Sequence, residues 1–219
     1  MQPLCQITWV TPAGRLVAIE PRPDEIAHHA GALAAAYNDP RNAPLLGHTE
    51  DVDEDDVIAH YAEVARAGGH NFLVFLERSE AGRGAPDGSA GAAGGSAPHG
   101  VNGALVADAD LRKVGRGAAE FAFMVASPAA QGKGLGTRVA TMVHAFGFRR
   151  LGLERIYASI IPGNAASRRV FDKLGYQVDD SPAARAYADE PGDLTMAIDR
   201  AAFERSHAPA MAEIEISVR

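Results

Sequence analysis

Three glycines at alternate positions, Gly132, Gly134 and Gly136, lie within residues 131–137. Glycine adopts positive φ without strain and lets other groups approach the backbone closely. Apolar side chains at helical spacing follow, which predicts that a helix begins at the end of this segment. The first N–H groups of a helix lack partners within it, and the helix dipole is positive there. The segment therefore predicts a binding site for an anion such as a phosphate.

Two common phosphate-binding motifs do not fit this segment. A P-loop requires Ser or Thr after a Gly-Lys pair to hold magnesium, whereas Gly134 follows Lys133 here. A dinucleotide fingerprint requires Gly-x-Gly-x-x-Gly in an early βαβ unit, but these glycines are spaced Gly-x-Gly-x-Gly and lie far into the chain. The sequence therefore disfavours both a nucleotide hydrolase and a dinucleotide-dependent enzyme.

A third pattern fits, Gln/Arg-x-x-Gly-x-Gly/Ala between a strand and a helix. Gln131, Gly134 and Gly136 occupy its positions, between an apolar run at 119–125 and the predicted helix. An Asn-x-x-Ser segment and a Lys-Leu-Gly-Tyr segment follow, at 164–167 and 173–176. Over residues 120–178 the chain resembles the Gcn5-related N-acetyltransferase (GNAT) superfamily, and most closely its ribosomal-protein-alanine and small-molecule branches.

The resemblance implies an α/β fold of the GNAT type, with a mixed, mostly antiparallel sheet of six to seven strands flanked by about four helices. Apolar runs bounded by turn residues predict strands, and amphipathic runs with acidic starts predict helices. The strands are expected at 15–20, 72–77, 101–109, 119–125, 155–161, 176–178 and 193–199. The helices are expected from after 24–25 to about 37, at about 54–67, from 135 to a stop at 151–152, and from after 167 to an end within 172–176. The strands at 72–77 and 101–109 should pair as a hairpin.

We expect one N-acetyltransferase domain over residues 15–203, between an N-terminal tail (1–14) and a C-terminal tail (204–219). Residues 79–100 are mostly Gly, Ala, Ser and Pro, so they should form a mobile insertion. A polar loop is expected at 179–192. Residues 214–218 alternate like an edge strand and could belong to a tail or to a subunit contact, which leaves a homodimer possible.

Composition restricts the function further. The 219 residues include one cysteine, Cys5, which excludes an internal disulfide and a cysteine metal cluster. No apolar stretch is long enough to span a membrane, so a cytoplasmic protein without membrane partners is expected. The net charge of −7 argues against nucleic-acid partners and favours cationic substrates.

Histidine spacings fit no zinc site, and the acidic segment at 50–56 lacks the Gly and Glu of a calcium loop, so no metal is expected. The acidic segment is interpreted as the start of a helix. The alternative is that its carboxylates line the pocket of a cationic acceptor.

The resemblance implies that an acetyl group passes from acetyl-CoA, as co-substrate, to an amine acceptor. The acceptor would be a primary amine of a small molecule or a protein N-terminus, attacking directly in a ternary complex. Glu120, eleven residues before Gln131, matches the general base of histone-acetylating members. Burial in an apolar strand would raise its pKa toward the working range. Alternatively, Glu120 faces solvent or pairs with an arginine.

The general acid departs from the family pattern, because Phe171 stands where many members have tyrosine. Ser167, Tyr157 and Tyr176 are substitutes by residue type, although Tyr176 is also expected to pack in the core. The catalytic candidates are therefore Glu120, Ser167 and Tyr176. Phe171 motivates an alternative function, a catalytically weak acyl-CoA-binding module or sensor. A protein-interaction domain that uses only the fold is a third reading, which the intact glycine segment disfavours.

Cofactor contacts are implied by the same resemblance. Pantetheine would lie along the strand that ends at Val125, and the pyrophosphate would meet the N–H groups of residues 132–137. Asn164 would bond pantetheine and Ser167 would approach the sulfur, or both would cap the last helix. Basic residues would contact phosphates. The expected cofactor-binding residues are Val125, Ala126, Gln131, Gly132, Lys133, Gly134, Leu135, Gly136, Thr137, Asn164 and Arg168.

Overall fold

The computed structural model describes residues 4–47, 50–77, 101–126 and 130–218. The insertion expected at 79–100 lies outside these ranges. Nine strands and seven helices are found among the described residues. No helix in these ranges is long and apolar enough to cross a membrane.

The strands form one sheet in the order β7-β8-β6-β5-β4-β3-β2-β1-β9. All neighbours are antiparallel except β5 and β6, which are parallel. The strands are β1 (Cys5–Thr11), β2 (Gly14–Ile19), β3 (His70–Glu77), β4 (Ala104–Gly115), β5 (Ala118–Val125), β6 (Arg155–Ile160), β7 (Gln177–Val178), β8 (Leu194–Asp199) and β9 (Glu215–Val218). The predicted mixed, mostly antiparallel sheet and the β3–β4 hairpin are confirmed.

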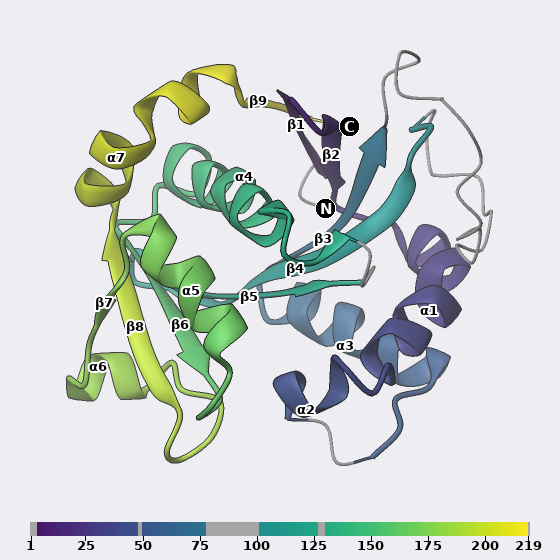
Figure 1. Ribbon diagram of the computed structural model, residues 1–219, viewed down its shortest axis with the longest axis horizontal. Helices are drawn as coiled ribbons and strands as arrows, with labels where there is room; N and C mark the ends of the chain where they lie inside the picture. The colour runs from purple at the N-terminus through teal and green to yellow at the C-terminus, as the bar shows by residue number, and fades with distance from the viewer. Residues whose placement is uncertain (1–3, 48–49, 78–100, 127–129, 219) are drawn as a thin grey trace.

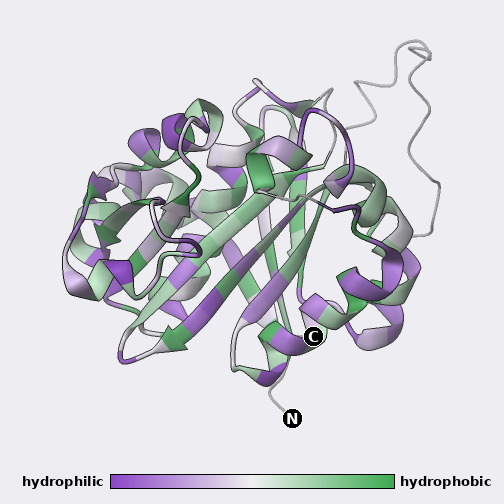
Figure 2. Ribbon diagram, turned by 90° about the horizontal axis from the view of Figure 1, so that it is seen from below, coloured by the Kyte–Doolittle hydropathy of each residue, from purple (hydrophilic) through white to green (hydrophobic). Residues whose placement is uncertain are grey.

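Helices cover both faces of the sheet (Figure 1). They are α1 (Pro23–Tyr37), α2 (Ala43–Leu46), α3 (Glu54–Arg66), α4 (Leu135–Arg149), α5 (Ala165–Leu174), α6 (Pro182–Arg185) and α7 (Arg200–Glu213). The helices α4, α5 and α7 pack over one core, and α1 and α3 pack over a second core on the opposite face. Most helices carry hydrophilic residues beside hydrophobic ones, as amphipathic surface helices do (Figure 2).

The predicted counts of six to seven strands and about four helices are too low. Residues 5–11, expected in a tail, form β1, in which Ile7 is fully buried. Residues 204–219, also expected as a tail, contribute most of α7 and all of β9. The additional helices α2 and α6 have four residues each, too few to show a helical period.

The parallel pairing of β5 with β6 is short, and this opens the sheet. It covers three residue pairs, from Ala118 with Arg155 to Glu120 with Tyr157. Beyond Glu120, β5 continues to pair with β4, and β6 continues to pair with β8. One edge of β5 at residues 121–125 is therefore left without a strand partner, and its backbone groups must bond elsewhere.

Candidate functional site

A cavity of about 870 Å³ lies where β5 and β6 part. Its wall includes residues 121–125 of β5, the N-terminal end of α4, and one side of α5. The opposite side is formed by α2, α3, β4, the end of α1 and the loop before β8. The volume is in the range of small-molecule and cofactor sites.

The three glycines have two different roles. Gly132 and Gly134 have φ of +73° and +76°, and Gly134 is the N-cap of α4. Because Gly134 has no side chain, the N-cap cannot satisfy the first N–H groups of α4. Gly136 lies inside α4, where an added Cβ would be 2.9 Å from Phe123 Cε2. Two glycines therefore shape the turn, and the third lets α4 pack tightly against β5.

Gln131 holds the glycine turn in place. Its Nε2 donates to Asn42 Oδ1 at 2.9 Å and to the Val125 carbonyl at 3.2 Å. Asn42 is buried and is the N-cap of α2, so this contact joins the turn to the opposite side of the cavity. The carbonyl of Lys133 accepts from Arg138 Nη1 at 3.0 Å. The Lys133 side chain is not part of the cavity wall, whereas Gln131 is.

Val125 and Ala126 differ in what they can offer a ligand. The Ala126 N–H donates to the Val106 carbonyl at 2.9 Å, so it is used within the sheet, and Ala126 is not on the wall. Neighbouring residues of a strand direct their hydrogen-bonding groups to opposite sides. Val125 therefore faces the open edge and lines the cavity. Val125 is therefore positioned for the predicted pantetheine contact, whereas the Ala126 N–H is already bonded within the sheet.

Asn164 and Ser167 lie together on the cavity wall at the start of α5. Asn164 Oδ1 accepts from the Ser167 N–H at 2.9 Å, so the capping alternative is confirmed for Asn164. Its Nδ2 donates to the Leu45 carbonyl at 2.9 Å, which ties α5 to α2. A side chain that joins both sides of the cavity in this way helps to fix its width.

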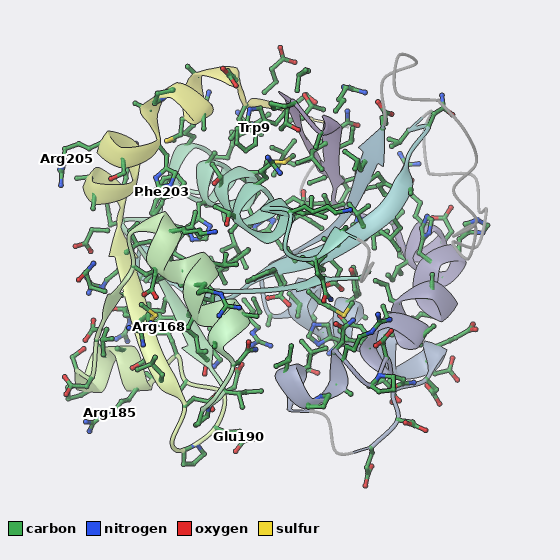
Figure 3. The ribbon with its side chains drawn as sticks, viewed as in Figure 1. Trp9, Arg168, Arg185, Glu190, Phe203 and Arg205 are labelled. Carbon is green, nitrogen blue, oxygen red and sulfur yellow. The ribbon has the colours of Figure 1, made fainter. Side chains whose placement is uncertain are left out.

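Arg168 is directed away from the cavity, and its neighbours take its expected place. Its Nε pairs with Asp172 at 2.9 Å, one turn further along α5. Figure 3 labels Arg168 on α5. Arg169 and Lys173 line the wall instead. They are four residues apart, so they lie on one face of α5. The spacing was visible in the sequence, but the face of α5 that points inward was not.

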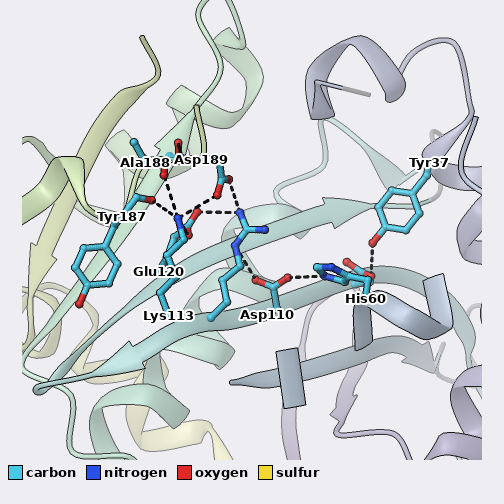
Figure 4. Close-up of polar contacts among 11 residues, drawn as sticks. Tyr37, His60, Asp110, Lys113, Glu120, Tyr187, Ala188 and Asp189 are labelled. Atoms are coloured by element: carbon cyan, nitrogen blue, oxygen red, sulfur yellow. Dashed lines mark hydrogen bonds and ion pairs between the residues drawn. The ribbon is translucent and has the colours of Figure 1, made fainter. Parts of the chain in front are cut away.

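Glu120 is ion-paired beneath the cavity. Its side chain is 1% exposed and contacts Arg112 Nη2 at 2.8 Å and Lys113 Nζ at 2.9 Å. Both cations also contact Asp189 (Figure 4). Burial raises the pKa of Glu120, as predicted, although the two cations oppose the shift. Glu120 does not line the wall, and the alternative that it pairs with an arginine is confirmed.

Tyr176 lies in the core and outside the cavity. It is 2% exposed, and its hydroxyl bonds His144 Nε2. His144 Nδ1 lies 2.6 Å from the Ala140 carbonyl, which can only accept, so Nε2 accepts from the tyrosine. Burial lowers the pKa of His144 to about 3, which keeps the imidazole neutral. With its hydroxyl committed to this bond, Tyr176 is placed wrongly among the candidate acids.

The other two candidate acids lie in different places. Tyr157 stacks on Tyr187, with 4.3 Å between the ring centres, and is absent from the wall. Of the three substitutes for the missing tyrosine, Ser167 alone lies on the wall. Phe171 also lines it and is buried.

Asp108 and Asp110 of β4 are site residues that the sequence analysis missed. Both are buried, and both line the cavity. Asp108 pairs across the sheet with Met124. Asp108 Oδ2 accepts from the hydroxyls of Tyr37 at 2.7 Å and Tyr61 at 3.0 Å. Acidic residues at alternate positions of an otherwise apolar strand were the signal that could have identified them.

Burial raises the pKa of Asp108 to about 6. The hydrogen bonds from Tyr37 and Tyr61 act in the opposite direction, because they stabilise the carboxylate, and the nearby charge of Asp110 adds to the increase. Asp110 is itself within 3.4 Å of His60 Nε2, and its hydrogen bond to that histidine, together with its charge, raises the histidine pKa (Figure 4).

Charge divides the cavity into two halves. The half formed by α4 and α5 contains the helix N-terminus and the cations Arg169 and Lys173. The other half contains six carboxylates, Asp56, Asp108, Asp110, Asp189, Glu190 and Asp193. Glu190 lies at the outer end of the loop before β8 (Figure 3). Arg112 also lines this half, but it is paired with Glu120 and Asp189.

The acidic segment at 50–56 begins a helix, as predicted. Asp53 is the N-cap of α3 and accepts from the Asp56 N–H at 2.9 Å, while the Asp56 side chain accepts from the Asp53 N–H. Of the acidic residues in the segment, Asp56 alone lines the cavity. In the part of the chain that the structure describes, no three His, Cys, Asp or Glu side chains form a group suited to a metal ion.

Comparisons with known proteins agree with this geometry. Residues 19–177 match the family described as "Acetyltransferase (GNAT) domain". The human alpha/beta-tubulin-N-acetyltransferase 9 is 40% identical over 58 residues, which are 26% of this chain and 28% of that protein. The chain therefore aligns with about a quarter of that relative's length.

Solved structures extend the similarity to nearly the whole fold. RimJ from Mycobacterium smegmatis, in complex with CoA-disulfide, has a TM-score of 0.66 at 18% identity, with 97% of each chain covered. The aminoglycoside acetyltransferase AAC(6')-Ib, in complex with coenzyme A and kanamycin, has a TM-score of 0.60 at 16% identity. That match covers 93% of this chain and 99% of the other.

Proposed function

The chain belongs to the GNAT acetyltransferase family, and on that premise we propose that it transfers an acetyl group from acetyl-CoA to a primary amine of a small molecule or a protein N-terminus. One observation carries the proposal. A single cavity has an uncapped helix N-terminus at one end, the open edge of β5 along its side, and carboxylates at the other end. These three parts suit a phosphate group, an extended thioester arm and a cationic amine.

The cofactor half of the cavity suits acetyl-CoA. The N–H groups at the start of α4 would bind the pyrophosphate, and Arg169 and Lys173 are the cations on the same half. The pantetheine arm would bond the open edge of β5 as a further strand does. A backbone N–H at this edge would polarise the thioester carbonyl, a role whose loss typically costs about 2.7–4 kcal/mol in enzymes.

The acceptor half suits a cationic amine. Six acidic residues line it, and one of them, Asp189, pairs together with Glu120 with its cation Arg112. Complementary charge of this kind accelerates encounter and excludes anionic competitors. The aminoglycoside acetyltransferase in complex with kanamycin and the tubulin N-acetyltransferase are relatives whose names also point to amine acceptors.

Direct attack by the amine is supported by the position of the one cysteine. Cys5 is buried in β1 and is not on the cavity wall. A covalent acetyl-cysteine intermediate would require a thiol within reach of the thioester. Transfer in a ternary complex requires no such carrier.

Titration calorimetry with acetyl-CoA, followed by an assay for thiol release with a panel of amines, tests the proposal. Gly134→Val should abolish or strongly weaken acetyl-CoA binding, because the side chain would obstruct the turn that shapes the phosphate site. Gly152→Val is the matched control, since Gly152 also has positive φ, +68°, but follows the other end of α4. Equal effects of the two variants on affinity would refute the site.

One observation favours a second candidate, a catalytically weak acyl-CoA-binding sensor. Phe171 lines the cavity where many family members have a tyrosine, and a phenyl ring cannot protonate a leaving thiolate. Tight acetyl-CoA binding without thiol release from any amine would support the sensor. Thiol release that depends on the amine would refute it.

A further inference from the structure

We infer that Asp108 is the group that accepts the proton from the acceptor amine, in place of Glu120. The inference rests on the acetyl transfer proposed above. It follows from where the two carboxylates lie relative to the cavity, from the hydrogen bonds that hold Asp108, and from the charges around it.

The position of Asp108 favours it over Glu120. Asp108 is on the cavity wall and lies opposite Met124, next to Val125 at the open edge of β5. Glu120 lies opposite Arg112, four residues further along β4, which corresponds to about 13 Å along a strand. Its side chain lies beneath Arg112 and Lys113. A substrate amine in the cavity would reach Asp108 without displacing an ion pair.

Two tyrosines fix the Asp108 carboxylate and leave one oxygen for a ligand. The hydroxyls of Tyr37, at the end of α1, and Tyr61, in α3, both donate to Oδ2. No hydrogen bond to Oδ1 is found within the described residues. A general base must be held firmly and still present a free lone pair, and this arrangement meets both requirements.

The groups around Asp108 set its basicity. Burial raises its pKa most, and the charge of Asp110 on β4 adds to this increase, whereas the hydrogen bonds from Tyr37 and Tyr61 and the charge of His60 on α3 lower it. From β5 the opposing residue is Met124, which does not titrate. The resulting pKa of about 6 leaves Asp108 ionised at neutral pH and more basic than an ordinary carboxylate.

Arg112 and Asp56 are also charged groups on this half of the cavity, besides Asp189, Glu190 and Asp193 of the loop before β8. Arg112 on β4 is held by Glu120 and Asp189, and Asp56 on α3 is held in the helix cap. Neither is among the main influences on the pKa of Asp108.

In the proposed reaction the acceptor nitrogen loses two protons. The ammonium R–NH₃⁺ gives one proton to the Asp108 carboxylate, and the free amine then attacks the thioester carbonyl carbon. The C–N bond forms, and the C–S bond breaks as the tetrahedral intermediate collapses. The second nitrogen proton accompanies the thiolate, so the products are the amide and the thiol of CoA. Asp108 then returns its proton to solvent.

The test measures thiol release as a function of pH, with the best amine found for the wild type. Asp108→Asn should lower kcat at least 100-fold, within the usual range for general bases, with acetyl-CoA affinity unchanged within twofold. The wild-type kcat/KM should decrease below about pH 6, following the pKa of Asp108. The kcat/KM of Glu120→Gln should decrease at nearly the same pH as that of the wild type.

Two further variants move the pH profile in opposite directions. Tyr37→Phe removes a hydrogen-bond donor that stabilises the Asp108 carboxylate. The acidic limb of the profile, which is the decrease in kcat/KM at low pH, should therefore shift to higher pH. Asp110→Asn removes a negative charge, so the limb should shift to lower pH. These shifts test the assignment even if Asp108→Asn does not fold, and a purely structural role for Asp108 would not produce them.

The outcomes separate the two proposals. The assignment of Asp108 would be overturned, with acetyl transfer still standing, if folded Asp108→Asn had the wild-type kcat. It would also be overturned if Glu120→Gln abolished the decrease in kcat/KM at low pH while Tyr37→Phe left that decrease at the wild-type pH. Acetyl-CoA binding without turnover of any amine by the wild type would overturn the proposed function, and the assignment with it.

Discussion

A catalytic carboxylate held in this way should reduce the stability of the folded protein. The pKa of Asp108 is about 6 in the folded state, compared with an ordinary value of 3.8. Between these values the folded state binds more protons than the unfolded state, so stability decreases as pH increases. The difference corresponds to about 3 kcal/mol above pH 6, at about 1.4 kcal/mol per pH unit. Asp108→Asn cannot ionise, so it should be free of this cost.

Thermal unfolding of the two proteins at several pH values measures this effect. Of the full cost, about 2 kcal/mol develops between pH 4.5 and pH 7.5, because an ordinary carboxyl is already partly ionised at the lower pH. The Tm of Asp108→Asn minus that of the wild type should therefore increase by about 4–8 °C over this range. Because the Tm difference between the two proteins is compared across pH values, any effect of the substitution on packing that does not depend on pH cancels.

Asp180→Asn is the control, because Asp180 is exposed and lies outside the cavity. Its Tm difference from the wild type should vary much less with pH. A constant difference for Asp108→Asn, or one that decreases toward neutral pH, would refute the reasoning that an ionised carboxylate is held here at the expense of stability.

Three other predictions follow from contacts in and around the cavity. Arg169→Ala should raise the Kd for acetyl-CoA several-fold in calorimetry, whereas Arg168→Ala should leave it nearly unchanged, because only the first lines the wall. Gly136→Ala places a Cβ 2.9 Å from a phenyl ring of β5, so denaturant unfolding should show a loss of about 1–3 kcal/mol. Tyr176→Phe leaves a buried histidine nitrogen without its donor and should cost about 1–3 kcal/mol of stability, with kcat retained in the thiol-release assay.

The glycine turn before α4 could be predicted from the sequence because its determinants are local. Gly132 and Gly134 lie within four residues of the helix that they precede, and their positive φ follows from the turn. Asp108 could not be found in this way. Its role depends on pairing with Met124, sixteen residues away, and on hydroxyls from α1 and α3, whose orientation depends on tertiary packing.

The difference between local and long-range determinants also explains which elements of the fold were not predicted. The helices α3 and α4 have apolar residues at helical spacing, α1 lies between an acidic start and an Asp-Pro stop, and β5 is an apolar run, so each was predicted. Strand β1 pairs with β9, so that Cys5 lies opposite Val218 at the other end of the chain. The indole of Trp9 donates to Glu213 at 3.0 Å across a similar separation. No local pattern reports a contact over more than 200 residues, so the N-terminal end resembled a tail, and the alternation at 214–218 indicated an edge strand but not its partner.

The charges of the cavity also explain the burial of Glu120. Without a partner, Arg112 and Lys113 would place two positive charges beside the half of the cavity where a cationic amine would bind. Glu120 and Asp189 pair with both cations, and Asp110 Oδ1 lies 3.8 Å from Arg112 Nε, so the carboxylates around the two cations outnumber them and Asp108 is left to act on the cavity. Removing one member of a buried ion pair leaves the other charge uncompensated, which makes the pairing costly to lose. On this argument Glu120 preserves the negative potential of the acceptor half, and Asp108 uses it.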